Sequence, residues 1–258
     1  MQLVALFCRD SSTQMLLNNL SSDAYHLHPI SNQRDVASAL RSLDTLEFAG
    51  ALVLDETLGT QAFAQVERSS LEARTLGTVD TVTVTPAGLV GEYNLGRAVG
   101  SALHANHWDV RGARVVVLGA DTAGAAAARE LASLGAEHVS LLAEDRPSAE
   151  AALRALAIRG QSEARALSEP LSAALISQAD VLVRTDARLS LELSLLGPHL
   201  SVIDLSSTPL SPLRKTALDV GAKSLGLRDI QAYQTSLALS HILGRSLETS
   251  TFLTLFHS

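Results

Sequence analysis

The stretch from Val115 to Arg146, VVVLGADTAGAAAARELASLGAEHVSLLAEDR, constrains the fold of this chain more than any other. It begins with an apolar, β-branched run and continues through a glycine turn into an alanine-rich segment of helical length. A second apolar run follows, and acidic residues end it. A strand, a helix and a second strand in this order form a parallel βαβ unit. The stretch therefore predicts a doubly wound α/β sheet in the second half of the chain.

The same alternation continues along the rest of this half. Short runs rich in Val, Leu and Ile recur between segments of helical length. From Ala113 onward, the pattern predicts helices at 122–134 and 148–158 and strands at 114–118, 138–142, 180–183 and 200–205. Strands and helices that alternate at these lengths indicate a parallel sheet with helices on both faces.

The first half of the chain holds a second α/β pattern. Apolar runs at 2–8, 24–30 and 48–55, with helical spacing between them, predict the order β-α-β-α-β, and Ser31 is the predicted N-cap of the second helix. A polar helical segment at 61–76, a hairpin turned at 86–88 and a helix from Leu95 follow. An amphipathic helix that starts at Asp229 is expected to close the molecule.

Composition and charge narrow the class of partner. The chain has 258 residues, of which 47% are hydrophobic and 18% charged, and a formal net charge of -7. It has no Lys/Arg-rich run, which argues against nucleic acid and anionic membranes as partners. The single cysteine, Cys8, allows no internal disulfide, and no apolar run approaches the roughly 20 residues that span a bilayer. We expect a cytoplasmic protein with a small-molecule ligand, and a homodimer is compatible with the sequence.

The glycine turn departs from the dinucleotide-binding fingerprint at one position. In G-x-G-x-x-G the first glycine makes the turn, the second lets the backbone approach pyrophosphate, and the third permits close helix packing. Here these positions hold Gly119, Asp121 and Gly124. A carboxylate at a helix N-terminus uses the N–H groups that a phosphate would use. We therefore interpret Asp121 as a helix cap that repels a cofactor phosphate.

The rest of the candidate cofactor site has the expected order. Glu144 follows the second strand, where an acid binds the ribose 2′-hydroxyl of NAD and disfavours the extra phosphate of NADP. If the turn binds a dinucleotide, we expect NAD. The alternative is a structural α/β unit with a solvated acidic loop and no cofactor. The candidate cofactor-binding residues are Gly119, Ala120, Asp121, Thr122, Ala123, Gly124 and Glu144.

Three further stretches occur in the order of a known enzyme family. LGTVDTVTVTPAGLVGEYNLGRAVGSAL (76–103) looks like A-V-N-T-V followed by G-x-N-T-D-x-x-G, and VIDLSSTPLSPL (202–213) looks like D-x-x-Y-x-P-x-x-T-x-L. IQAYQTSLALSHILGR (230–245) looks like the M-L-x-x-Q-a helix. In these features and in their order, the chain resembles the shikimate dehydrogenase family, which includes shikimate and quinate dehydrogenases.

The resemblance implies two α/β domains with the ligand cleft between them. Residues 1–100 would bind the substrate and be closed by the C-terminal helix at 229–258, and residues 101–228 would form a Rossmann-like NAD(P)-binding domain. It also implies a reaction of aromatic amino acid biosynthesis. In that reaction a hydride passes reversibly between the nicotinamide dinucleotide and a small polyhydroxy cyclic acid such as shikimate.

Both proton-transfer residues of the family are missing. The family's lysine falls at about Leu58, and the only lysines of this chain are Lys215 and Lys223. The family's aspartate falls at Leu95, or at Asn94 if the register shifts by one residue. General acid/base groups contribute about 10²- to 10⁴-fold in rate, so their loss removes most of the catalysis unless other groups replace them. The candidate replacements at predicted strand ends are Asp80, Glu56 and Tyr93, with Asp55 beside them.

At the other positions that bind substrate or cofactor in the family, this chain keeps some residues and replaces others. Gln234 is the best retained substrate contact, Asp80 stands where the family has a substrate-binding asparagine, and Ser11 and Ser12 are candidates for the carboxylate-binding serines. Ser207 replaces the tyrosine of the Y-x-P segment. Ala143, Glu144 and Asp145 replace the N-R-T that clamps the NADP phosphate, which favours NAD.

Two hypotheses about function follow. The first is an NAD(P)-dependent oxidoreductase of the shikimate dehydrogenase type, and the second is a non-catalytic relative that binds a small acid or nucleotide in the cleft. A Rossmann-like methyltransferase fits the acid after the second strand but leaves the first domain unexplained. The histidine pairs at 26/28 and 104/107 lack a third ligand, so we predict no metal site.

Overall fold

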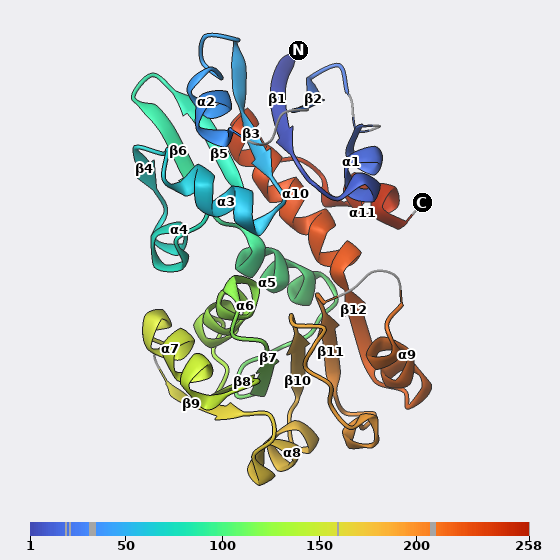
Figure 1. Cartoon of the computed structure of the whole chain (residues 1–258). Coiled ribbons are helices and arrows are strands. Elements are labelled where there is room, and N and C mark those ends of the chain that lie inside the picture. The colour runs from blue at the N-terminus through green and yellow to red at the C-terminus, as the bar shows by residue number, and fades with distance from the viewer. Residues whose placement is uncertain (19, 21, 31–34, 159, 207–209, 258) are drawn as a thin grey trace. The chain divides into compact units, whose positions relative to one another are not determined.

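The computed structural model describes residues 1–18, 20, 22–30, 35–158, 160–206 and 210–257. The chain divides into two compact units, which Figure 1 shows as a ribbon. Unit 1 comprises Met1–Asn94 with Ala232–Ser258, and unit 2 comprises Leu95–Gln231. Within the described residues, each unit is built on one six-stranded sheet.

The sheet of unit 1 is mixed, in the order β2-β1-β3-β5-β6-β4. β1 pairs in parallel with β2 and β3, whereas β5 pairs antiparallel with β3 and β6. The predicted order β-α-β-α-β and the hairpin are both confirmed. The strands are β1 (Gln2–Phe7), β2 (Tyr25–Pro29), β3 (Phe48–Val53), β4 (Arg68–Ser69), β5 (Thr81–Thr85) and β6 (Gly88–Glu92).

The helices between these strands are short and capped by side chains. α1 (Ser11–Asn18) follows β1, and α2 (Val36–Arg41) begins after Asp35, whose carboxylate accepts from the Ser38 N–H. Asp35 is therefore the N-cap of α2, and the predicted cap Ser31 lies outside the described residues.

The prediction of one helix over 61–76 is wrong. The structure has α3 (Glu56–Phe63), then β4, then α4 (Leu71–Leu76). Asp55 caps α3 through the Leu58 N–H at 2.9 Å, and Ser70 caps α4 through the Ala73 N–H at 3.1 Å. Because each cap starts a new helix, the polar segment is divided, and β4 adds an edge strand beside β6.

The C-terminal segment forms two helices instead of one. α10 (Leu227–Leu243) and α11 (Thr249–His257) replace the predicted helix at 229–258. α10 is also not amphipathic, because residues 232–236, 238, 239 and 242 are all buried. Phe252 and Phe256 of α11 belong to the same core cluster as Leu239 of α10 and Leu6 of β1. α10 is thus covered both by the sheet and by α11.

Unit 2 is a doubly wound parallel sheet with the order β12-β11-β10-β7-β8-β9. All its strand pairs are parallel, so the predicted fold class is confirmed. The predicted strands are present, together with two that the sequence pattern did not reveal, β9 and β12. The strands are β7 (Arg114–Leu118), β8 (His138–Ala143), β9 (Gln161–Ala166), β10 (Val181–Arg184), β11 (Ser201–Asp204) and β12 (Lys223–Gly226).

Helices connect these strands. Beyond the predicted helices, the structure contains α8 and α9, and both begin with a proline in the first helical turn. The helices are α5 (Leu95–Ala105), α6 (Thr122–Ser133), α7 (Arg146–Leu156), α8 (Pro170–Ser177) and α9 (Pro212–Asp219).

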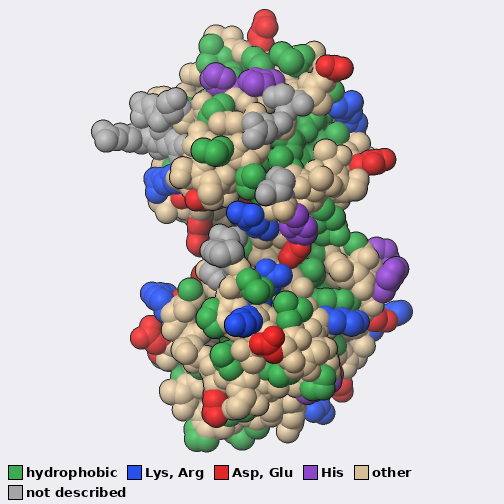
Figure 2. Space-filling model, turned by 90° about the vertical axis from the view of Figure 1, so that its right-hand side faces the viewer, with side chains coloured by type: hydrophobic (Ala, Val, Ile, Leu, Met, Phe, Trp, Pro, Cys, Tyr) green, Lys and Arg blue, Asp and Glu red, His purple; other side chains and the backbone are tan. Residues whose placement is uncertain are grey.

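The surface carries charges of both signs. On the face drawn in Figure 2, Lys/Arg and Asp/Glu side chains are interspersed and no extended area of one sign is visible. Among the described residues, no helix combines the length and apolarity needed to cross a membrane. The same residues contain no group of three or more His, Cys, Asp or Glu side chains placed to hold a metal ion.

Candidate functional site

The topological switch point of unit 2 lies between β7 and β10. These two strands are neighbours in the sheet, yet the chain continues from β7 towards β8 on one side and from β10 towards β11 on the other. In doubly wound sheets, the helices on either side of such a point leave a crevice at the carboxyl ends of the strands, where ligands bind. The residues after Leu118 and Arg184 therefore define the candidate site of this unit.

Both fingerprint glycines are required by close packing at this point. Gly119 has φ +135°, and a Cβ added there would lie 2.0 Å from Oγ1 of Thr185. A Cβ added at Gly124 would lie 2.2 Å from the carbonyl oxygen of Gly119. The turn from β7 into α6 is thus as tight as a dinucleotide-binding turn requires.

Asp121 uses the donors at the start of α6. Its Oδ1 accepts from the Gly124 N–H at 2.7 Å and from the Thr185 hydroxyl at 2.8 Å. The interpretation of Asp121 as the helix cap is confirmed. A negative charge consequently occupies part of the position where a cofactor phosphate would approach.

The acids after β8 take separate roles. Asp145 caps α7, because its carboxylate accepts from the N–H of Ser148 at 2.8 Å and from its hydroxyl at 2.9 Å. Glu144 precedes it and is exposed. Both acids are exposed, and they differ in that the Asp145 carboxylate is used as the cap of α7.

An arginine at the switch point was missed by the sequence analysis. Arg188 follows β10 and forms a salt bridge of 2.8 Å with Asp186. Thr185 and Asp186 both donate their backbone N–H groups to the carbonyl of Leu118, so this turn is attached to the end of β7. The available signal was an Asp-x-Arg sequence directly after a predicted strand.

Unit 1 contains a buried polar group centred on Asp80. Oδ2 of Asp80 accepts from the Asn94 backbone N–H at 2.6 Å and from the Gln234 amide at 2.8 Å. Oδ1 accepts from the Thr81 hydroxyl at 2.8 Å and from the Asn94 amide at 3.0 Å. The group connects three parts of the unit: the start of β5, the short link between β6 and α5 that contains Asn94, and α10.

Burial dominates the electrostatics of this group. Asp80 is 2% exposed, and desolvation raises the pKa of its carboxyl against the opposing effect of hydrogen bonds from Gln234, Asn94 and Thr81. The structure brings together two of the predicted substrate-binding residues, Asp80 and Gln234. It adds Asn94, which the sequence analysis considered only as the position of a lost acid.

The other candidates of unit 1 lie in different settings. Ser11 and Ser12 are exposed at the start of α1, and Ser12 donates to Asp10 at 2.7 Å. Glu56 is exposed in the first turn of α3. Tyr93, half-buried, packs against the core cluster on the α2–α3 side of the sheet. Leu58, to which the sequence resemblance approximately assigns the family's lysine, is fully buried in that cluster.

An ion pair between α10 and β6 lies near the Asp80 group. His241 lies two helical turns after Gln234, and its Nδ1 pairs with Glu92 at the end of β6. Glu92 is the register partner of Thr81 in the hairpin, and its carbonyl accepts from the Asp80 N–H at 2.9 Å. The pair therefore borders the Asp80 group along the hairpin.

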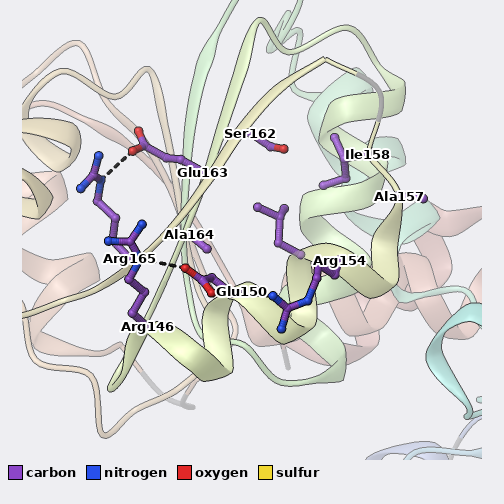
Figure 3. Close-up of a pocket in the computed structure, with 10 residues that line it drawn as sticks. Arg146, Glu150, Arg154, Ala157, Ile158, Ser162, Glu163, Ala164 and Arg165 are labelled. Carbon is purple, nitrogen blue, oxygen red and sulfur yellow. Dashed lines mark hydrogen bonds and ion pairs between the residues drawn. The ribbon is translucent and has the colours of Figure 1, made fainter.

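A pocket of about 500 Å³ lies elsewhere in unit 2, between α7 and β9 (Figure 3). Its charged side chains are paired with one another: Arg146 contacts Glu150 at 2.9 Å, and Arg165 contacts Glu163 at 2.6 Å. Because the pocket lies at the edge strand β9 and not at the switch point between β7 and β10, we do not assign the ligand site to it.

No protein-family model and no curated protein sequence matches this chain. Solved structures match over the full length. Quinate dehydrogenase from Corynebacterium glutamicum in complex with NAD has a TM-score of 0.86 at 20% identity, covering 99% of this chain and 98% of that chain. This chain has the shikimate dehydrogenase fold.

Other solved structures give the same result. Shikimate 5-dehydrogenase from Listeria monocytogenes, in complex with shikimate and NAD, has a TM-score of 0.84 at 15% identity over 99% of this chain and 96% of that one. The 5-ketofructose reductase of Gluconobacter has a TM-score of 0.83 at 22% identity over 99% and 98%. The resemblance seen in the sequence is thus confirmed for the fold.

Proposed function

We propose that this protein is a nicotinamide-dinucleotide-dependent oxidoreductase that acts on a small polyhydroxylated compound, such as a cyclic acid of the shikimate type. The observation that carries the proposal is the turn from β7 into α6. It places Gly119 and Gly124 in close contact at the switch point of a doubly wound sheet. Structures of the same fold are described as complexes with NAD or NADP, which supports the cofactor class.

The residues at the switch point fit a dinucleotide in backbone geometry. The segment Gly119–Gly124 would hold the pyrophosphate, and Glu144 would bind the adenosine ribose, which favours NAD over NADP. Asp121 is the one residue of the segment that opposes a phosphate. When bound, the nicotinamide ring supplies the hydride donor or acceptor.

Asp80 is the candidate acid/base group. Burial raises the pKa of the Asp80 carboxyl in the direction of neutral pH. This shift suits a group that exchanges a proton with a substrate hydroxyl. Gln234 and Asn94 fix its orientation. A substrate hydroxyl would take the place of one of these amide donors.

The test is hydride transfer, followed at 340 nm, with NAD or NADP and each of shikimate, quinate and 5-ketofructose. We expect turnover with NAD for at least one compound. Glu144→Gln should raise the KM for NAD several-fold, because the ribose hydroxyl exchanges a charged carboxylate acceptor for a weaker, neutral amide oxygen. Glu137→Gln is the control, since Glu137 is also exposed but precedes β8 instead of following it. Absence of turnover with every pair would contradict the proposal.

A non-catalytic binder is the second candidate, and two observations favour it. Asp121 already fills the start of α6, and Leu58 stands buried where the related enzymes have a lysine. Melting temperatures distinguish the two functions. A non-catalytic binder of small acids would be stabilised by shikimate or quinate and not by NAD, whereas the oxidoreductase would be stabilised by NAD.

A further inference from the structure

Arg188 is exposed, yet its guanidinium is held in a defined position. The side chain is 83% exposed, and Asp186 binds it through two atoms: Nε donates to Oδ1 at 3.0 Å and Nη2 donates to Oδ2 at 2.8 Å. The backbone N–H of Arg188 donates to the same Oδ1 at 2.9 Å. This arrangement fixes the guanidinium in advance, which lowers the entropy lost when it binds an anion.

This Asp-x-Arg turn adjoins the glycine turn. The backbone nitrogen of Asp186 lies 3.2 Å from the position of a Cβ at Gly119. Thr185, the preceding residue, donates to Asp121 at 2.8 Å. The Arg188 turn and the start of α6 are therefore directly connected across the switch point.

Arg188 also interacts electrostatically with the two acids of the candidate cofactor site, Glu144 and Asp121. Its pKa is raised first by the hydrogen bonds to Asp186 and by the Asp186 charge, and the charges of Glu144 and Asp121 add to this effect. Asp121 lies at the pyrophosphate position and Glu144 at the ribose position of a doubly wound sheet. The positive charge of Arg188 is thus felt at both the pyrophosphate position and the ribose position.

We propose that Arg188 binds a phosphate of the dinucleotide and offsets the negative charge that Asp121 brings to the glycine turn. The role rests on the proposed function. The ligand class is a nucleotide with a pyrophosphate, such as NAD or ADP-ribose. A planar guanidinium suits this ligand, because the Nη1/Nη2 edge, which Asp186 does not occupy, can donate two parallel hydrogen bonds to phosphate oxygens. Adenosine, which lacks phosphate, should not depend on Arg188.

The chain contains a matched control for this arginine. Arg111 forms the same Asp-x-Arg turn with Asp109: Nε donates to Oδ1 at 3.0 Å and Nη2 donates to Oδ2 at 2.7 Å. Its side chain is 79% exposed. Arg111 precedes β7, whereas Arg188 follows β10, so the two arginines lie at opposite ends of the parallel strands.

The experiment is calorimetric titration of the full chain and of Arg188→Gln and Arg111→Gln with NAD, ADP-ribose and adenosine. We expect Arg188→Gln to raise the Kd for NAD and ADP-ribose about 10- to 100-fold, the effect of one charge-assisted pair. Arg111→Gln should leave both values unchanged. Both variants should melt at the wild-type temperature, because neither side chain is buried.

The outcomes separate the two proposals. If the wild-type protein binds NAD and Arg188→Gln binds it equally well, the role of Arg188 is wrong and the proposed function stands. An equal loss in Arg188→Gln and Arg111→Gln, or a matching loss for adenosine, would also overturn a phosphate contact. If the wild-type protein binds neither NAD nor ADP-ribose, both proposals are wrong.

Discussion

Asp80 is the residue on which the polar group of unit 1 depends. Its two oxygens accept four hydrogen bonds, from Thr81, Gln234 and twice from Asn94. Asp80→Asn would turn an amide NH₂ against neighbouring donors. We expect a loss of about 2–4 kcal/mol in the free energy of unfolding, the cost of leaving buried polar atoms unpaired. Urea denaturation measures it.

Asp35→Asn is the control for this prediction. Asp35 is an exposed N-cap, and asparagine caps a helix equally well, so the variant should stay within about 0.5 kcal/mol of wild type. Equal stability of the Asp80→Asn and wild-type proteins would show that the four donors do not stabilise a carboxylate.

For single residues, the sequence predicted a role correctly where that role depends on residues close by in the sequence. Asp121 as a helix cap followed from its place at the start of a helix. The grouping of Asp80, Asn94 and Gln234 needed the structure, because Asp80 and Gln234 are 154 positions apart. Arg188 was not predicted, since an Asp-x-Arg turn has no functional signal until its distance from Gly119 is known.

The element that controls cofactor binding is the start of α6. Asp121→Asn keeps the cap and removes the charge, so we expect unchanged stability and about threefold to tenfold tighter NAD binding. Asp35→Asn is the matched control, because Asp35 caps α2 in the same way but belongs to unit 1, whereas the switch point belongs to unit 2, so NAD binding should be unchanged. NAD binding that is unchanged or weaker in Asp121→Asn would contradict the proposed repulsion.

Elements were predicted where their apolar pattern was strong. β7 (RVVVL) and β8 (HVSLLA) were evident from sequence alone. β9 (QSEARA) was missed because an edge strand needs few apolar side chains, and β12 (KSLG) was missed because it is short. The amphipathic assignment of α10 failed because the helix is covered by both the sheet and α11, which a local pattern cannot show.

For the whole molecule, the order of motifs carried the correct prediction of fold. Three stretches in sequence indicated the shikimate dehydrogenase fold, and solved structures of that fold match 99% or more of the chain at 22% identity or less. The order of these stretches along the chain is retained despite the low sequence identity, because the topology of the fold fixes it. The resemblance places the family's lysine at about Leu58 and its aspartate at Leu95, or at Asn94 if the register shifts by one residue, so the absence of both catalytic groups stays a prediction.

Hydrogen–deuterium exchange of the full chain with and without NAD tests the central claim most directly. The claim is that unit 2 binds a dinucleotide at the switch point. We predict that saturating NAD slows exchange in peptides covering 118–126 and 184–189, with a smaller effect at 143–146. Peptides covering 109–114, at the opposite end of the strands, should be unaffected. Unchanged exchange at 118–126 and 184–189 under saturating NAD would contradict the claim.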